Sequence, residues 1–381
     1  MMTHNGVDTY FDACRITFRD RPETHRIDLY VAHAERARED PVHFYRLANA
    51  CLDGGSIALW HQGVSLALGR LHETTRSRDA RREALGRLGD WSAWQDRGWP
   101  TDPTDLPAVV DRWWDGAEDL SGKTVLVSDL GGHGDAIRWL RFAEALYDSV
   151  LAPIVWAVPG SLVELFDYNF RHLPRMQAWD RDRTNAHFDR ALHAQLLPRL
   201  IGPLPPFVRR SAPSPLTLPQ QTIGARLGLA WACGNGLDHL ERSVPLRVLM
   251  PFLWQPDIEF YSLQVGEVAH EASIYPRFHM PDSPIESFTD TANVIAGLDG
   301  VITVDTAVAH LAGSLGVPTL TLLPFPSDIL WGFADTTPWY PTMRLIRQRA
   351  PSDWLSIQPQ VQQALESRWW LQSTNVHPVH R

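Results

Sequence analysis

Two segments in which expected strands alternate with helices constrain this chain's fold more than any other feature. The first has strands at 124–127, 154–158 and 176–179, with helices at 136–147, 161–166 and 188–200. The second has strands at 227–231, 258–263, 301–304 and 319–323, with helices at 246–254, 290–298 and 306–315. Such alternation is typical of parallel sheets covered by helices on both faces. The sequence therefore predicts an α/β fold with two Rossmann-like, doubly wound domains.

A proline-rich stretch separates the two segments. Residues 203–219 contain six prolines, a density that prevents regular strand pairing and indicates an interdomain linker. Residues 1–111 have a mostly helical pattern, without a clean repeat of about 34 residues. The expected organisation is a reduced, repeat-like helical region at 1–111, a first Rossmann-like domain with its linker at 112–220, a second at 221–355, and a C-terminal helix and tail at 356–381.

Composition excludes several classes of protein. The formal net charge of −9 argues against a nucleic-acid partner. No apolar stretch reaches about 18 residues and the N-terminus lacks an apolar core, so we expect neither a membrane span nor a signal peptide, and a cytoplasmic location. The three cysteines form no C-x-x-C pair, which argues against a structural zinc or a disulfide framework. Lys123 is the only lysine, which excludes a P-loop and argues against a pyridoxal phosphate Schiff base.

Two patterns that resemble metal-binding motifs are weak in this sequence. Asp180 and Asp182 match a D-x-D pattern, but they follow a strand end, and we interpret them as a solvated turn. The sixteen histidines show no H-E-x-x-H spacing, so a zinc hydrolase is not expected. The sequence thus predicts no metal ion.

The first candidate for chemistry is the loop Gly131-Gly-His-Gly-Asp135, which leads from a strand into a helix. Glycines allow a ligand to approach the backbone, and a helix N-terminus favours negative charge. Asp135 is either an N-cap or a general base. His133 is either a surface side chain or a contact to donor or acceptor.

The second candidate is the run from Val301 to Gly316, in which a buried strand delivers Asp305 and Thr306 to a helix start. His310 lies four residues after Thr306, so both occupy one helix face. Backbone N–H groups, a hydroxyl and an imidazole at that position suit a diphosphate. The alternative makes Asp305 a cap and His310 a packed core residue.

The third candidate is the loop that follows the strand at 227–231. Arg242 in this loop could clamp a phosphate with its fork of donors. It could instead pair with Glu241 or Asp238 at the surface.

Eight runs over about residues 112–354 resemble the glycosyltransferase domain of bacterial tetratricopeptide-repeat glycosyltransferases and, more distantly, the lipopolysaccharide heptosyltransferases. The most specific are Asp305-Thr-Ala-Val-Ala-His-Leu-Ala-Gly313 and Pro338-Trp-Tyr-Pro341; the others lie at 114–116, 120–127, 134–139, 242–246, 260–264 and 288–292. The resemblance implies a GT-B fold, with two Rossmann-like domains facing a cleft and the donor held mainly by the second. It also implies metal-independent transfer of a sugar from a nucleotide-diphosphate sugar to a protein, peptide or small-molecule acceptor, with no cofactor.

Carried over position by position, the resemblance makes Asp135 the base, with His133 beside it. The implied donor-site residues are Gly132, Gly134, Asn235, His239, Arg242, Ser243, Gln264, Asp305, Thr306, Ala307 and His310. Two alternatives stay open. His133 stands where the family has an apolar residue, and the loop around Cys233 is altered, which favours a non-catalytic protein that binds a nucleotide or a partner. A nucleotide-sugar epimerase shares the same architecture.

Overall fold

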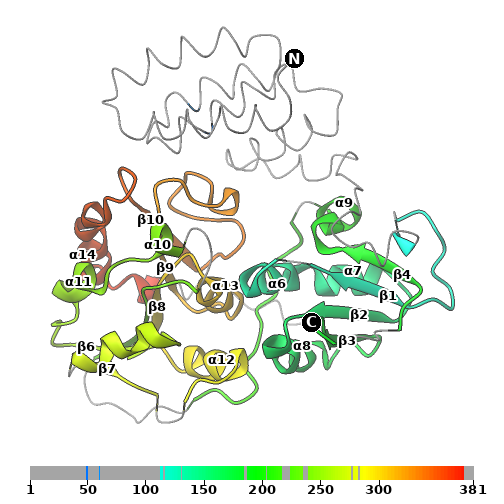
Figure 1. The fold of residues 1–381 in the computed structure, drawn as a ribbon, viewed down its shortest axis with the longest axis horizontal. Helices are drawn as coiled ribbons and strands as arrows, with labels where there is room; N and C mark the ends of the chain where they lie inside the picture. The colour runs from blue at the N-terminus through cyan, green and yellow to red at the C-terminus, as the bar shows by residue number, and fades with distance from the viewer. Residues whose placement is uncertain are drawn as a thin grey trace, which may run out of the picture. The chain divides into compact units, whose positions relative to one another are not determined.

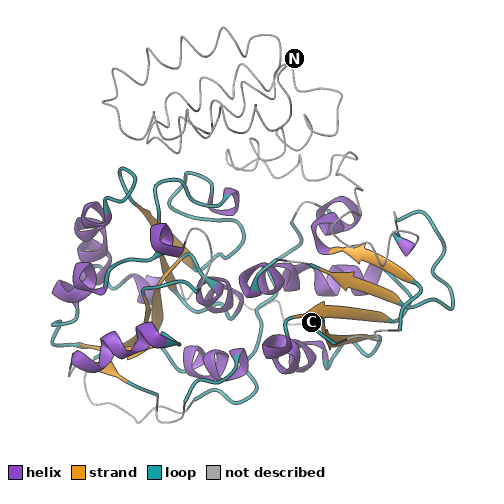
Figure 2. Cartoon of the chain, in the orientation of Figure 1, coloured by secondary structure: helices purple, strands orange, loops and turns teal. Residues whose placement is uncertain are grey.

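The computed structural model describes residues 112–372, except 115, 130, 184–186, 203, 217–223, 235–238, 276–277 and 282–283, together with Asn49 and Trp60. The predicted helical region at 1–111 therefore lies outside the described residues except at Asn49 and Trp60, as does the tail from residue 373. Within the described part, strands and helices alternate through two successive sheets (Figure 1, Figure 2).

The first sheet has four parallel strands in the order β3-β2-β1-β4, which are β1 Val125–Ser128, β2 Ile154–Val158, β3 Met176–Asp180 and β4 Arg190–His193. All five residues of β2 are buried. Strand β1 lies between β2 and β4, so the strand order reverses beside it. In doubly wound sheets the loops at such a reversal hold the ligand, which places the loop after β1 at the expected position.

The helices of the first half are α6 His133–Trp139, α7 Ala143–Ser149, α8 Val163–Phe170 and α9 Leu197–Ile201, with 3₁₀ helices at Leu140–Phe142, Gly160–Leu162 and Ala194–Leu196. The predicted helix at 188–200 is wrong over its first half, where β4 lies. The backbone N–H groups of Asp189 and Arg190 donate to the carbonyl of Thr124, and β4 pairs in parallel with β1. This pairing with a distant strand overrides the local helical pattern.

The second sheet has six strands in the order β10-β9-β8-β5-β6-β7, which are β5 Ala225–Ala230, β6 Ile258–Ser262, β7 Phe278–His279, β8 Gly300–Val304, β9 Thr319–Leu323 and β10 Met343–Arg347. The neighbouring strands β7 and β6, β6 and β5, β5 and β8, and β8 and β9 all pair in parallel. The order reverses between β5 and β8, so the loops after these two strands form the second expected ligand position. Strands β7 and β10 were not predicted from the sequence.

The helices of the second half are α10 His239–Arg242, α11 Leu246–Leu249, α12 Phe288–Ala296, α13 Ala307–Ser314, α14 Gln358–Glu366 and α15 Trp369–Gln372, with 3₁₀ helices at Met250–Phe252, Glu267–Ile274, Ile329–Trp331 and Trp354–Ile357. Helix α13 follows the buried strand β8, as predicted, and Gly316 after it has a φ of 66°. The side chain of Arg209 lies 3.2 Å from where a β-carbon of Gly316 would stand. Glycine is therefore favoured at this helix end both by conformation and by space.

The linker between the halves is held by specific polar contacts. The backbone N–H of Arg210 donates to the carbonyl of Ser314 at the end of α13 over 2.8 Å. Its guanidinium forms an ion pair with Glu144 of α7 and donates to the carbonyl of Leu140 over 2.5 Å. Because Arg210 is buried, this charge is stabilised by its partners rather than by water. The linker is thus fixed to helices of both halves.

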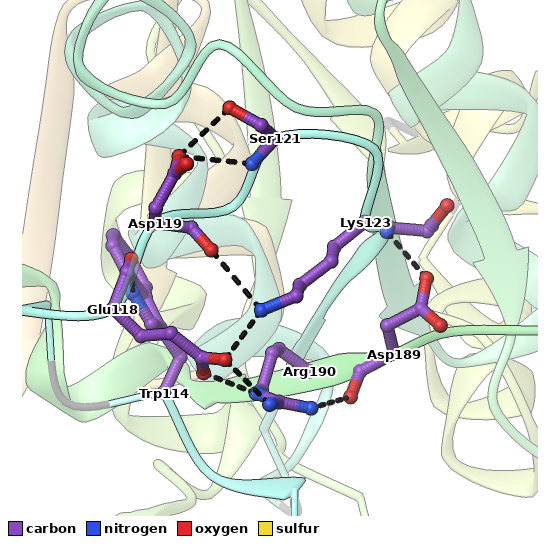
Figure 3. Close-up of polar contacts among 8 residues, drawn as sticks. Trp114, Glu118, Asp119, Ser121, Lys123, Asp189 and Arg190 are labelled. Carbon is purple, nitrogen blue, oxygen red and sulfur yellow. Dashed lines mark hydrogen bonds and ion pairs between the residues drawn. The ribbon is translucent and has the colours of Figure 1, made fainter.

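A charged cluster joins the segment before β1 to strand β4 (Figure 3). The carboxylate of Glu118 accepts hydrogen bonds from Lys123 and from Arg190, with 2.6 Å between Arg190 Nη2 and Glu118 Oε1. The carboxylate of Asp189 accepts from the Thr124 N–H over 2.8 Å. The hydrogen bonds from Arg190 and then Lys123 lower the pKa of Glu118 to about 2. The single lysine therefore has a structural ion-pair partner.

The chain divides into two compact units. One comprises residues 102–322, 335–346 and 358–381 and contains almost all of both sheets; the other comprises residues 1–101, 323–334 and 347–357. Within the latter, the guanidinium of Arg347 donates to the Gly332 carbonyl over 2.5 Å and lies over the ring of Phe333. Trp60 packs edge-on against that same ring. The sites described below lie within the former unit.

Candidate functional site

The start of helix α13 is built by a cap and a buried strand. Thr306 is the N-cap in extended conformation, and its hydroxyl accepts a hydrogen bond from the Val308 N–H over 3.1 Å. Thr306 and not Asp305 therefore caps the helix. Asp305 is buried, and its carbonyl accepts from Arg242 Nη1 over 3.1 Å. Arg242, from α10, thus lies directly beside the strand end that leads into α13.

The start of helix α6 is closed by Asp135. Its carboxylate accepts a hydrogen bond from the Gly132 N–H over 2.8 Å, and its other oxygen lies 2.9 Å from Arg138 Nη2. A β-carbon at Gly131 would stand 2.5 Å from the Asp135 carboxylate, so only glycine fits there. Asp135 is the third helical residue, and it caps the helix by reaching back rather than from the N-cap position. Its side chain keeps 35% of its surface exposed, so a ligand can still reach it.

The two helix starts meet at Gly134 and His310. A β-carbon at Gly134 would stand 2.7 Å from His310 Cδ2, 3.4 Å from His310 Nε2 and 3.5 Å from the α-carbon of Ala307. Helices α6 and α13 pack side by side along this line (Figure 1). The structure therefore brings Asp135 from the first half and Thr306 and His310 from the second half to one junction.

The other edge of the His310 ring is fixed by a tyrosine. His310 Nδ1 lies 2.9 Å from the hydroxyl of Tyr340, and both side chains are buried. Burial raises the pKa of Tyr340 well above its ordinary value, so the phenol keeps its proton. His310 is consequently a packed histidine, as one of the two interpretations of the sequence has it, and its contact with a diphosphate stays a prediction.

His133 lies between elements of both halves. Its Nε2 is 3.0 Å from the hydroxyl of Ser161, and its ring stacks on Phe288 of α12 with centroids 4.9 Å apart. Burial and then the charge of Arg181 lower the pKa of His133, which favours the neutral imidazole. Ser161 contacts His133 from within the 3₁₀ helix Gly160–Leu162, which precedes α8.

The loop after β5 is held by side chains that the resemblance assigned to the donor site. The side-chain oxygen of Gln264 accepts from the N–H groups of Trp231 and Ala232 at 3.1 and 3.0 Å, and its amide donates to the Ala232 carbonyl. The hydroxyl of Ser243 accepts from the Cys233 N–H over 3.2 Å. Gln264 and Ser243 thus shape this loop through its backbone.

Two of the predicted donor-site residues are placed only in part. Asn235 lies outside the described residues, and His239 is described only as the first residue of α10.

The D-x-D turn is described at both aspartates: Asp180 accepts from the Asp182 N–H and pairs with Arg183. Both contacts are those of a turn.

Sequence reasoning missed two residues that contact Asp135 or His310, and a third that holds the segment before Tyr340. Arg138 pairs with Asp135, Tyr340 binds His310, and Arg141 donates to the carbonyls of Pro338 and Trp339 at 2.7 and 2.6 Å. Burial lowers the pKa of Arg141 to about 10. The only signal for Tyr340 was its place in the Pro338–Pro341 run, and Arg138 could have been found from its spacing of three residues after Asp135.

No group of three or more metal-binding side chains occurs among the residues that the structure describes. Across the same residues, no helix combines the length and the apolar character that crossing a membrane requires.

The fold and the family comparison agree on the class of protein. The two Rossmann-like halves form an α/β fold of the GT-B type, that of two-domain glycosyltransferases. Residues 284–350 match the model of Glycosyltransferase family 9 (heptosyltransferase), a range that contains β8, α13 and the run from Asp305 to His310. These findings support a glycosyltransferase.

The individual proteins that are similar to this chain have low sequence identity to it. Protein FlbA of Caulobacter vibrioides is 27% identical over 310 aligned residues, covering 68% of this chain and 49% of FlbA, so the chain spans about half of that relative's length. The glycosyl transferase family 9 structure from Veillonella parvula has a TM-score of 0.51 at 11% identity and covers 68% of this chain and 99% of its own. E. coli heptosyltransferase WaaC, solved with ADP-2-deoxy-2-fluoro heptose, has a TM-score of 0.41 at 13% identity, covering 64% and 99%.

Proposed function

We propose that this protein transfers a sugar from a nucleotide-diphosphate sugar to a hydroxyl or another nucleophile of an acceptor. The observation that carries the proposal is the junction at Gly134 and His310, where helix α6, which carries Asp135, packs against the start of α13. A base and an anion-binding helix start are the two components that such a transfer needs. The match of residues 284–350 to a glycosyltransferase family supports it independently.

The start of α13 is the proposed seat of the donor diphosphate. The first N–H groups of a helix have no partner within the helix and carry partial positive charge. Thr306 adds a hydroxyl, and Arg242, held on the Asp305 carbonyl, adds a guanidinium at the same strand end. Together these groups stabilise the negative charge of the leaving nucleoside diphosphate.

Asp135 is the proposed base. As the acceptor oxygen forms its bond to the anomeric carbon, the bond from that carbon to the phosphate oxygen breaks. The acceptor proton passes to the Asp135 carboxylate, and the electron pair of the broken bond leaves on the diphosphate. The Gly132 N–H and Arg138 hold the carboxylate in one orientation while part of it stays exposed.

Turnover measurements with an acceptor panel test this proposal. Calorimetry with UDP-, GDP-, ADP- and dTDP-sugars first identifies a donor, with heptosyl and hexosyl forms of each, since the matched family is described as heptosyltransferase. Asp135→Asn should then fold, bind the donor and lose about 100-fold or more in turnover. Asp148→Asn, on the exposed end of α7, is the matched control and should transfer normally. Unchanged turnover in Asp135→Asn would remove this residue from the mechanism.

A non-catalytic nucleotide-binding role is the second candidate, and one observation favours it. Both carboxylate oxygens of Asp135 already have partners, in the geometry of an ordinary helix cap. Donor binding by calorimetry, with neither transfer to any acceptor nor hydrolysis of the donor, would favour this role over transfer.

A further inference from the structure

The guanidinium of Arg181 lies against the loop between β1 and α6. Arg181 directly follows β3, and its backbone N–H donates to the carbonyl of Val158 at the end of β2 over 2.9 Å. Its side-chain Nη1 donates to two carbonyls of the loop, that of Asp129 over 3.0 Å and that of Gly131 over 2.7 Å. A side chain that follows β3 thus holds the loop that follows β1.

The second of these carbonyls belongs to the same peptide unit as the N–H that binds Asp135. Arg181 binds the carbonyl of Gly131. Across the same peptide bond, the Gly132 N–H donates to Asp135 Oδ2 over 2.8 Å. Because a trans peptide is planar, its carbonyl and its N–H point in opposite directions. This peptide therefore links the guanidinium on one side to the carboxylate on the other.

The peptide between Gly131 and Gly132 needs a partner that holds its orientation. Neither flanking residue has a β-carbon, so this peptide can rotate as a unit more easily than one between other residues. Glycine is nevertheless required at position 131, because a β-carbon there would stand 2.5 Å from the Asp135 carboxylate. Rotation would turn the Gly132 N–H away from Asp135. It would also break the hydrogen bond from Arg181, which therefore opposes it.

The carboxylate of Asp129 fixes a different part of the same loop. It is buried, and it accepts from the Gly131 N–H over 2.8 Å and from Trp139 Nε1 over 2.5 Å. The Gly131 N–H belongs to the preceding peptide. Among the described hydrogen bonds, those from Arg181 and to Asp135 are therefore the ones that hold the peptide between residues 131 and 132.

We propose that Arg181 is a positioning residue that holds the peptide between Gly131 and Gly132 in the orientation that binds Asp135. Under the proposed function, on which this role rests, the carboxylate is held in one orientation before the acceptor arrives. A charged donor on the carbonyl also polarises the peptide and strengthens the N–H on its other side. Loss of Arg181 should therefore lower turnover and leave donor affinity as it is.

Amide hydrogen exchange tests the peptide contact without any ligand. In the full-length protein labelled with ¹⁵N-glycine, the Gly132 signal is assigned by its loss in Gly132→Ala, whose β-carbon would meet the Asp135 carboxylate only at 3.8 Å. Arg181→Met removes every side-chain donor and should speed exchange at Gly132 about tenfold, the equivalent of a hydrogen bond to a charged group. Exchange at Gly316, whose N–H donates to the Gly313 carbonyl at the end of α13, should not change.

Further variants separate positioning from a general loss of stability. Arg181→Lys keeps the charge without the planar fork, so exchange at Gly132 should increase less than in Arg181→Met. Arg183→Met removes an exposed guanidinium of the same turn, paired with Asp180, and should leave Gly132 unchanged. If Arg181→Met does not fold, Arg181→Gln takes its place with the same expectation. Unchanged exchange at Gly132 overturns the proposal, and so does an equal increase at Gly132 and Gly316.

Turnover tests the consequence, with the donor that calorimetry identifies. Arg181→Met should lower kcat about tenfold and keep the donor KM within about twofold, because the lost interaction positions the base and does not hold the donor. Arg181→Lys should be intermediate, and Arg183→Met should match the unmodified protein. An unchanged kcat in Arg181→Met overturns the positioning role. If the unmodified protein transfers to no acceptor, the proposed function fails, while exchange at Gly132 still decides whether Arg181 holds the peptide.

Discussion

The imidazole of His310 lies against the backbone of Gly134, so close that a β-carbon at residue 134 would stand 2.7 Å from Cδ2. These residues belong to α13 of the second half and α6 of the first. The absence of a side chain at Gly134 is therefore what lets the two helix starts approach each other. Any group at this position would push the imidazole away from the junction.

Gly134→Ala is expected to destabilise the protein and to weaken diphosphate binding. The added methyl group meets a buried ring that is fixed on its far side by Tyr340, so it cannot be accommodated by a simple rotation. Overpacking of this kind costs about 1–3 kcal/mol in the free energy of unfolding. Urea unfolding measures the loss, and calorimetry with a nucleoside diphosphate measures binding.

Gly234→Ala is the matched control for this substitution, since a β-carbon there meets nothing within 4 Å. Its free energy of unfolding should stay within about 0.5 kcal/mol of the unmodified protein. Equal stability of the two alanine variants would contradict the close approach of Gly134 and His310.

Thr306→Ala is expected to lower both stability and diphosphate affinity. It removes the hydroxyl that accepts from the Val308 N–H, and loss of such a cap costs about 1 kcal/mol. Ser287→Ala removes the equivalent cap of α12, where Ser287 accepts from Asp290 N–H. Both variants should lose similar stability by urea unfolding, but only Thr306→Ala should weaken binding. Equal losses of affinity would show that the Thr306 effect is structural.

The regular parts of this fold could be predicted because their signals are local. The run at 154–158 is apolar throughout and forms β2 at those residues, and the strand before Thr306 leads into α13 as expected. The sequence failed at β4, because Arg190–His193 becomes a strand only by pairing with β1, more than sixty residues earlier. Long-range pairing of this kind leaves no periodicity in a single segment.

In the candidate site, too, some residues could be predicted from local spacing and others depend on tertiary contacts. The places of Asp135 and Thr306 at helix starts could be predicted because each follows a strand end, and His310 shares a helix face with Thr306 by its spacing of four residues. Tyr340 could not, because its contact with His310 joins two segments thirty residues apart and depends on the packing of its ring against Gly313. Spacing located the helix starts, but the partners that fix their side chains come from the tertiary structure.

Glu118→Gln is expected to remove a pH-dependent part of the stability. The pKa of Glu118 is lowered from 4.5 to about 2 by Arg190 and Lys123, so the folded state favours the charged form. This contribution is fully present above about pH 4.5 and is lost as the pH falls toward 2. Because the group is exposed, the effect should be small and should weaken further with added salt.

The difference in urea midpoint between Glu118→Gln and the unmodified protein measures this contribution at each pH. The difference should shrink as the pH decreases through that range. Glu286→Gln, at an exposed carboxylate without such partners among the described side chains, is the control and should show a smaller difference throughout. A Glu118→Gln difference that does not change with pH would contradict the ion-pair origin.

His133 is expected to make the protein less stable as the pH falls. The folded pKa of His133 lies below the ordinary value of 6.5, first because the ring is partly buried and then because Arg181 is near, so the unfolded chain takes up the proton more readily. Stability should therefore be highest above about pH 6.5 and should decrease as the pH drops through the lowered folded pKa. His133→Gln removes the titrating group and should reduce the difference in urea midpoint between about pH 7.5 and about pH 5.5. His187→Gln, at an exposed histidine, should leave that difference as it is. If His133→Gln keeps the full pH dependence, the prediction is wrong. The His133 ring would then be protonated as easily in the folded protein as in the unfolded chain, and its contacts with Ser161 and Phe288 would not disfavour the charged form.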